Sequence, residues 1–150
     1  MAGTFTNLLY HVVFSTKGRR PLIRTDLQEE LFHYIGGIIR GERGALLEIG
    51  GMPDHVHLLS RFRADVSVAE MSRRIKSNSS KWVNDRSLGG KRFQWQTGYS
   101  AFSVSESQVA SVRRYIRTQE SHHRKLSFQD ELTALLRKHG IEFDERYVVD

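Results

Sequence analysis

Two histidines, His55 and His57, stand one residue apart in the apolar run HVHLL. On a β-strand, residues i and i+2 point to the same face, so the two imidazoles would lie side by side. Neutral imidazole is a common ligand of divalent cations, and the pair could therefore hold one metal ion. The chain has seven histidines, and a His-x-His pair alone also fits two partly exposed side chains.

A second pair of chemically capable residues lies further along, in the segment VRRYIRTQESHHRK. Tyr115 and Gln119 are four residues apart, so they would share one face of a helix. Tyr115 could instead pack in the core beside Ile116, whereas a buried amide such as that of Gln119 needs hydrogen-bond partners. His122 and His123 continue this face and could be further ligands, proton carriers or a solvated helix end.

Basic residues gather on three segments that could flank such a site. Each group alone fits an ordinary solvated face, but together they could contact the phosphates of a nucleic acid. The candidates are Lys17, Arg19 and Arg20 in a loop, Arg73, Lys76 and Lys81 on an expected helix, and Arg113 and Arg117 beside Tyr115. Phe93, Trp95 and Tyr99 could stack on unpaired bases, although core packing is expected for at least two of them.

The surrounding pattern predicts the elements that position these residues. Four stretches rich in aromatic and β-branched residues predict strands: Leu8–Ser15, 45–49, His55–Phe62 and 93–104, the last broken at Gly98. Gly50, Gly51, Pro53 and Asp54 predict the turn between the second and third strands. Three capping-box patterns predict helix starts: Thr25 with Gln28, Ser67 with Glu70, and Ser105 with Gln108. Ser127 and Asp130 open a fourth helix, which is expected to stop at Gly140. The third of these helices would carry both Tyr115 and Gln119.

The resulting order, β-α-β-β-α-β-α-α, predicts an α+β fold. Its first six elements form the ferredoxin-like arrangement (split βαβ, RRM-like), an antiparallel sheet with helices on one face. The helix with Tyr115 and a C-terminal helix would be additions to it. RRM-like domains often leave the other sheet face free to bind RNA. No linker divides the chain, so we expect one domain over residues 1–150, with 126–150 as a C-terminal helical extension.

Composition narrows the classes of function. The chain has a net charge of +6, and the excess is uneven, because residues 126–150 hold three basic and six acidic residues. A basic body suggests a polyanionic partner, with nucleic acid the leading candidate. Cysteine is absent, which excludes disulfides, thiolate metal sites and a thiol nucleophile. No apolar segment predicts a membrane span or a signal peptide, so we expect a cytoplasmic protein with no membrane partner.

The combination of His55-Val56-His57 with Tyr115-x-x-x-Gln119 resembles the IS200-like single-tyrosine HUH transposases and their REP-associated relatives. The stretches YHVVFSTKGRRPLI, MPDHVHLL and FQWQTGYSAFSVS also resemble segments of this family, and the resemblance covers about residues 8–125. Many minimal members end soon after the catalytic helix, whereas this chain continues with a further helix that we expect to pack against the rest.

The resemblance implies that the protein is a transposase, a metal-dependent DNA endonuclease and strand transferase. Tyr115 would be the nucleophile that forms a 5′-phosphotyrosine bond, and His55, His57 and Gln119 would bind Mg²⁺ or Mn²⁺. Its partners would be single-stranded DNA hairpins and a second copy of the chain in a homodimer.

Two other functions stay open from the sequence. One is a non-catalytic module of RRM-like topology that binds single-stranded nucleic acid, which leaves Tyr115 and Gln119 unexplained. The other is a different HUH nuclease, of the replication-initiator or relaxase type. Covalent capture of DNA by Tyr115 separates both nuclease types from the binding module.

Overall fold

The computed structural model of the chain describes residues 3–86 and 92–148. Its centre is a four-stranded sheet in the order β2-β3-β1-β4, in which each neighbouring pair is antiparallel. The strands are β1 (Leu8–Ser15), β2 (Ala45–Met52), β3 (His55–Phe62) and β4 (Ser100–Val104). This order is that of the ferredoxin-like arrangement, and the predicted fold class is confirmed.

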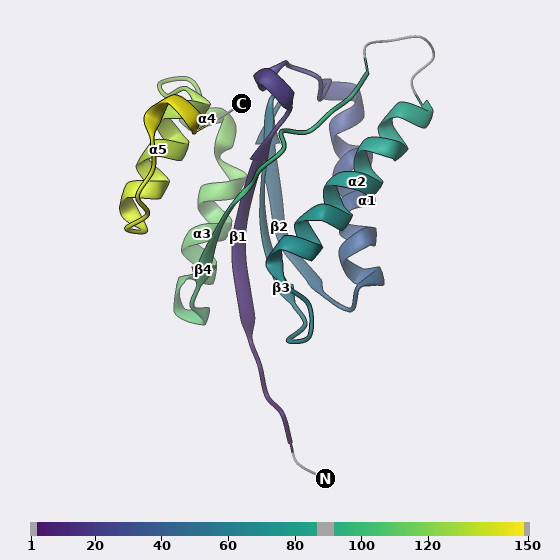
Figure 1. Cartoon of the computed structure of the whole chain (residues 1–150), viewed down its shortest axis with the longest axis vertical. Helices are drawn as coiled ribbons and strands as arrows, with labels where there is room; N and C mark the ends of the chain where they lie inside the picture. The colour runs from purple at the N-terminus through teal and green to yellow at the C-terminus, as the bar shows by residue number, and fades with distance from the viewer. Residues whose placement is uncertain (1–2, 87–91, 149–150) are drawn as a thin grey trace.

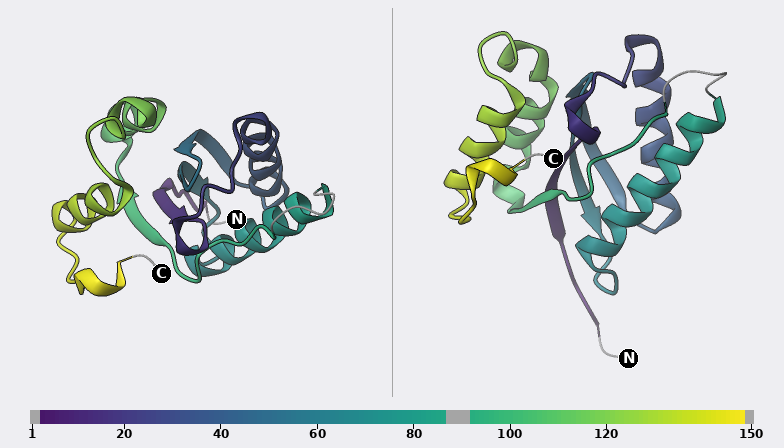
Figure 2. Two further views of the ribbon diagram at one scale, coloured as in Figure 1. Left: turned by 90° about the horizontal axis from the view of Figure 1, so that it is seen from above. Right: turned by 45° about the horizontal axis from the view of Figure 1, so that its top comes forward.

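Helices cover both faces of the sheet (Figures 1 and 2). The long helices α1 (Thr25–Gly41) and α2 (Val68–Arg86) lie on one face. The other face carries α3 (Val109–Arg117), α4 (Gln119–His122) and α5 (Phe128–Lys138). Three short 3-10 helices complete the described elements: η1 (Lys17–Arg19), η2 (Glu106–Gln108) and η3 (Glu145–Tyr147). None of the helices in the described part of the chain is long and apolar enough to cross a membrane.

The larger apolar core lies between the sheet and helices α1 and α2. Alternate strand residues point into it, because successive side chains of a strand face opposite ways. Its buried members include Val12, Phe14, Val56 and Leu58 from the sheet and Leu31, Ile35, Ile39, Met71 and Ile75 from the helices. Each such side chain contributes roughly 1.5–3 kcal/mol of burial free energy, so this core fixes the sheet that positions the histidines.

A smaller core attaches α5 to the opposite face of the sheet. Val13 and Phe102 from the sheet pack with Phe128, Leu132 and Leu136 from α5. The packing expected for the C-terminal helix is therefore confirmed. The face that RRM-like domains often leave free is covered in this protein by the helices that follow β4.

Two strand boundaries differ from the sequence prediction. Gly50 and Gly51 belong to β2 rather than to the turn, and the turn itself is formed by Pro53 and Asp54. The fourth strand begins only at Ser100, and the segment before it is linked to the end of β1 by an isolated bridge between Thr16 and Trp95. Lys76 Nζ donates to the carbonyls of Thr97 and Gly98 in this segment.

At two of the four predicted helix starts, a serine hydroxyl caps the backbone. The hydroxyls of Ser67 and Ser127 accept from the backbone N–H three residues ahead, at 3.0 and 3.1 Å. The predicted caps at Thr25 and Ser105 are wrong. The helix after Arg24 has no side-chain cap, and Ser105 Oγ bonds to Ser107 Oγ instead.

Candidate active site and metal centre

The two histidines of β3 point to the face of the sheet that α3, α4 and α5 cover. His55 and His57 are completely buried, and their ring centroids lie 5.2 Å apart. Val56 and Leu58 point the other way, into the larger core. The two imidazoles therefore share one face, as strand alternation requires.

Each histidine has a hydrogen-bond partner at Nδ1. Asp54 Oδ1 lies 2.7 Å from His55 Nδ1, and His11 Nε2 on β1 lies 2.8 Å from His57 Nδ1. Burial alone would raise the pKa of Asp54, but the hydrogen bond from His55 holds it below its usual value. Burial and the neighbouring His57 lower the pKa of His11 to about 3, so His11 is neutral. Such partners fix the ring orientation of metal-ligating histidines.

We expect Asp54→Asn to weaken divalent-metal binding by about 10- to 100-fold, because an amide holds the His55 ring less firmly than a carboxylate. Titration calorimetry with Mn²⁺ measures this, with Asp65→Asn as the control because Asp65 is exposed and pairs with Arg63. Equal Mn²⁺ affinity in both variants would show that Asp54 does not orient a ligand.

Tyr115 and Gln119 approach the histidines from the covering helices. Gln119 Oε1 lies 2.9 Å from His55 Nε2, and the ring centroid of Tyr115 lies 5.8 Å from that of His57. The prediction of one continuous helix is wrong, because Thr118 departs from helical geometry with φ −102° and ψ 26°. Its hydroxyl donates to carbonyls one turn back, which competes with regular helix bonding. The two side chains reach the same site from two short helices.

A glycine in β2 lets α3 lie this close to the sheet. A Cβ atom on Gly50 would collide with the carbonyl oxygen of Ile116, the residue after Tyr115, and would lie 3.0 Å from Ile116 Cγ2. The close approach of α3 explains why a strand residue at this position is glycine.

We expect Gly50→Ala to destabilise the protein by about 1–3 kcal/mol and to displace α3 from the sheet. Urea unfolding measures the change in stability, with Gly41→Ala as the control, since a Cβ there meets nothing within 4 Å. The prediction fails if the two variants unfold at the same urea concentration.

Glu131, in the first turn of α5, brings the C-terminal helix into the site. Its side chain is 1% exposed, and Oε1 lies 3.0 Å from His57 Nε2 and 3.5 Å from His55 Nε2. Oε2 accepts a hydrogen bond from Gln119 Nε2 at 2.8 Å and another from the Tyr115 hydroxyl. One carboxylate thus contacts the four side chains that the sequence singled out.

Glu131 was not among the residues predicted for the site, although its position in the sequence gives one signal. Glu131 lies between Phe128 and Leu132 on the apolar stripe of α5, where a charged residue is unusual unless it is paired. His11 was missed for a similar reason, since it lies on a buried strand face beside Leu9 and Val13.

Burial and hydrogen bonding set the charges of this cluster. Burial alone would raise the pKa of Glu131, but hydrogen bonds from His57, Tyr115 and Gln119 hold it far below its usual value, so the carboxylate is ionised. Burial lowers the pKa of His57, which favours neutral imidazole, the form that binds metals. Burial and the Glu131 carboxylate raise the pKa of Tyr115, so its hydroxyl keeps its proton.

These side chains fit a divalent metal ion. Within the described residues, the ligand atoms of His55, His57 and Glu131 lie within 4.8 Å of one another. Gln119 Oε1 adds an oxygen at 2.9 Å from His55 Nε2. Neighbouring ligands of an octahedral ion with bonds of about 2.1 Å are roughly 3 Å apart, so the spacing and the nitrogen and oxygen donors both suit such an ion.

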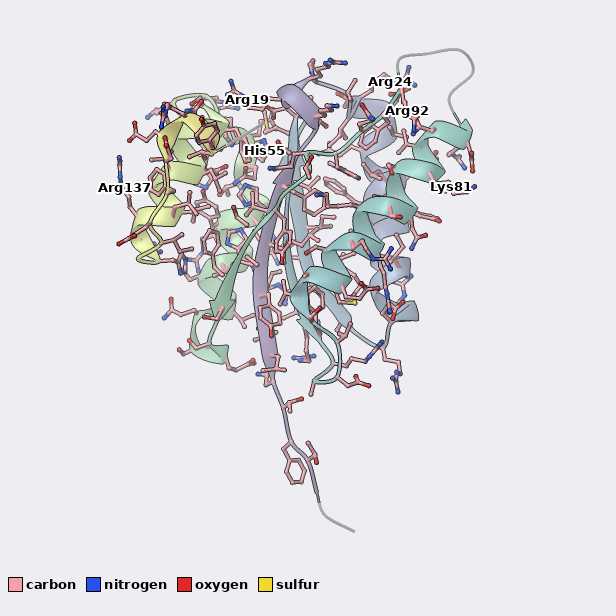
Figure 3. All side chains as sticks on the ribbon, viewed as in Figure 1. Arg19, Arg24, His55, Lys81, Arg92 and Arg137 are labelled. Atoms are coloured by element: carbon pink, nitrogen blue, oxygen red, sulfur yellow. The ribbon has the colours of Figure 1, made fainter. Side chains whose placement is uncertain are left out.

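The predicted loop cations lie at the same end of the sheet as the site. Lys17, Arg19 and Arg20 are exposed and follow Ser15, which is paired with His55 in the sheet. Figure 3 shows Arg19 and His55 at this end of the molecule.

The cations of α3 connect it to the sheet. The Nε atoms of Arg113 and Arg117 lie 3.4 and 2.8 Å from Glu48 Oε1 on β2. Both side chains are also partly exposed, so they can face solvent while they hold α3 in place.

The cations of α2 lie on the other side of the molecule from α5. In Figure 3, His55 lies between Arg137 of α5 on one side and Lys81 of α2 on the other. Each predicted cation of α2 has a local partner: Arg73 pairs with Glu70, Lys81 pairs with Asp85, and Lys76 donates to the carbonyls of Thr97 and Gly98.

The three aromatic residues before β4 divide as predicted. Phe93 and Trp95 are buried, and Trp95 Nε1 donates to Ser79 Oγ at 2.9 Å. Tyr99 is 39% exposed. Core packing is thus confirmed for two of them, and only Tyr99 is open to a stacking partner.

The chain is similar to known transposases. The family model described as "Transposase IS200 like" matches residues 4–119. The ISDra2 transposase TnpA of Deinococcus radiodurans is 25% identical over 130 residues, which cover 82% of this chain and 89% of that protein. The residues that the family model matches include the histidine pair, Tyr115 and Gln119, whereas Glu131 lies beyond them.

Solved structures share the fold. A crystal structure of a candidate transposase from Deinococcus radiodurans R1 superposes with a TM-score of 0.63 at 22% identity, covering 79% of this chain and 95% of that chain. A REP-associated tyrosine transposase bound to a REP hairpin superposes with a TM-score of 0.61 at 17% identity, covering 82% and 74%.

Proposed function

Because the chain belongs to the IS200-like transposase family, we propose that it cuts and rejoins single-stranded DNA at hairpin-marked ends through a 5′-phosphotyrosine bond on Tyr115, with a divalent metal ion. Membership makes it a DNA-cleaving transposase. The nucleophile, the metal and the form of the DNA are our proposals.

The position of the Tyr115 hydroxyl carries this proposal. It donates to Glu131 Oε2, while Oε1 of the same carboxylate lies 3.0 Å from His57 Nε2. A hydroxyl beside a base and next to a group of metal-binding side chains is the arrangement that nucleophilic attack on a phosphate requires.

In the proposed cleavage step, the Tyr115 oxygen attacks the phosphorus atom. A bond forms between Tyr115 Oη and phosphorus, and the bond between phosphorus and the 3′ oxygen breaks, leaving its electron pair on that oxygen. The Glu131 carboxylate receives the phenolic proton and can pass it to the departing 3′ oxygen. Rejoining reverses these events, because a 3′ hydroxyl attacks the phosphotyrosine and needs no external energy.

His55, His57, Gln119 and Glu131 would hold the ion, and a bound Mg²⁺ or Mn²⁺ would polarise the scissile phosphoryl oxygen and orient the phosphate for in-line attack. Asp54 and His11 hold the two imidazoles in the required orientation. Burial of the cluster excludes bulk water, which would compete with the tyrosine as a nucleophile.

We propose that the exposed cations bind the DNA backbone. Lys17, Arg19 and Arg20 would contact phosphates nearest the site, since η1 directly follows the strand paired with β3. Five further cations would contact more distant phosphates: Arg73, Lys76, Lys81, Arg113 and Arg117. The hairpin in the REP-associated transposase structure supports a hairpin substrate for this chain.

A homodimer is part of the proposal. One chain provides one Tyr115, and cutting both ends of an element requires two nucleophiles. Tyr115 lies beside the histidines of its own chain, so each protomer of such a dimer would have a complete set of site residues.

The other two functions have less support. A binding module of RRM-like topology needs an accessible sheet face, and α3 and α5 cover that face. A replication initiator or relaxase shares the chemistry, but the family match is to transposases.

The proposal is tested by incubating the purified protein with 3′-labelled single-stranded hairpins from the DNA flanking its gene. We expect a labelled protein band on a denaturing gel with Mn²⁺ or Mg²⁺, and its disappearance with a chelator. A labelled band of equal strength in the chelator would contradict the metal-dependent mechanism. Bound but uncut DNA under all conditions would favour the binding module.

A further inference from the structure

His123 lies immediately after α4 and reaches into the same cluster. Its Nε2 atom lies 3.0 Å from Glu131 Oε1 and 3.2 Å from Gln119 Oε1, and its side chain is only 8% exposed. The family match ends at Gln119, so this histidine lies outside the matched residues.

The hydrogen-bond partners of His123 indicate which ring nitrogen carries the proton when the ring is neutral. Its Nδ1 atom lies 2.7 Å from the backbone carbonyl oxygen of Leu126. A carbonyl only accepts hydrogen bonds, so Nδ1 carries the proton of the neutral ring. In the neutral ring, which is the form that binds metals, Nε2 of His123 therefore presents a lone pair to Gln119 and Glu131.

Hydrogen-bond partners also set the proton position of neutral His55 and the orientation of the Gln119 amide. In the neutral ring of His55, the proton lies on Nδ1, facing the Asp54 carboxylate, so Nε2 presents a lone pair to Gln119 Oε1. Gln119 Nε2 donates to Glu131 Oε2, which turns Oε1 of the amide toward both histidines.

Three neutral acceptor atoms thus lie beside the Glu131 carboxylate without a proton between them: Nε2 of His55, Nε2 of His123 and Oε1 of Gln119. Buried acceptors without a donor are costly, and lone pairs about 3 Å apart repel one another. A cation bound by these three atoms together with Glu131 Oε1 removes both costs.

We propose that His123 is a ligand of the metal ion, together with His55, His57, Gln119 and Glu131. The inference rests on the metal site of the proposed function and extends it to a third imidazole. Imidazole nitrogen binds Mn²⁺ and later transition-metal ions better than Mg²⁺, which prefers oxygen ligands and bound water. The site should therefore bind Mn²⁺ more tightly than Mg²⁺.

The test is titration calorimetry of the metal-free protein with Mn²⁺ and with Mg²⁺, without DNA. We expect tighter binding of Mn²⁺, and we expect His123→Ala to weaken Mn²⁺ binding by at least about tenfold. His122→Ala is the matched control, because His122 is adjacent in sequence but stacks on Tyr115 and contacts Thr118 instead of the cluster. Thermal unfolding without metal verifies that both variants fold, and His123→Gln replaces the alanine variant if it does not.

Each result decides between the alternatives. Unchanged Mn²⁺ affinity in a folded His123 variant would overturn the inference while leaving the proposed function intact. Equal loss in His122→Ala would also overturn it, because the effect would come from the segment rather than from a ligand. A wild-type protein that binds neither ion would overturn the inference and the metal part of the proposed function together.

Discussion

Replacement of Tyr115 by phenylalanine should reduce covalent capture of DNA by at least about 10³-fold, because no other group in the site replaces the attacking oxygen. The change removes one oxygen atom and leaves the ring beside His57 and His11. Glu131 loses one hydrogen bond but keeps those from Gln119 and His57, so we expect only about 1 kcal/mol of lost stability.

Hairpin binding provides the second measurement for this variant. Electrophoretic mobility shift should show near-normal affinity, since the exposed cations that would bind phosphates are unchanged. Tyr147→Phe is the control, because Tyr147 is 76% exposed and lies on η3 outside the cluster. A phenylalanine variant that still forms the adduct would exclude Tyr115 as the nucleophile.

Replacement of Glu131 by glutamine should weaken Mn²⁺ binding by at least about tenfold and reduce adduct formation by about 10²-fold or more. Glutamine keeps the shape of the side chain but removes the charge that balances a metal ion. It also removes the base that would accept the proton of the Tyr115 hydroxyl. In addition, it introduces an amide NH₂ group among the lone pairs of the cluster.

The control for this variant is Asp130→Asn. Asp130 is the neighbouring acidic residue of the same helical turn, and it is exposed. The hydrogen bond to Ser127 comes from the backbone N–H of Asp130, so Asp130→Asn leaves this cap in place. Calorimetry with Mn²⁺ and the gel assay measure the two effects. If Glu131→Gln bound Mn²⁺ and formed the adduct as well as the wild type, the role of α5 would be limited to packing.

The sheet and the positions of the histidines could be predicted because they depend on local pattern. The bounds of β1 and β3 agree with the sequence prediction, since both strands are unbroken runs of β-forming residues between turns. Alternation within β3 then places His55 and His57 on one face, without knowledge of any distant contact.

The remaining parts of the site depend on contacts between distant segments. Glu131 lies 74 residues after His57, and their contact depends on the packing of α5 against Val13 of β1 and Phe102 of β4. Gly50 shows the same limit, because its pattern is typical of a turn and only the approach of α3 explains its place in a strand. The helix caps could not all be predicted either, because similar sequence patterns gave different contacts. Ser127 caps its helix, whereas Ser105 bonds to a neighbouring serine.

The most direct test of the central claim is mass spectrometry of the protein after reaction with a single-stranded hairpin, nuclease digestion and proteolysis. We expect the peptide with Tyr115 to carry a 5′-linked nucleotide after incubation with Mn²⁺ and to carry none after incubation with a chelator. A nucleotide on a different residue, or the same yield on Tyr115 without metal, would contradict it.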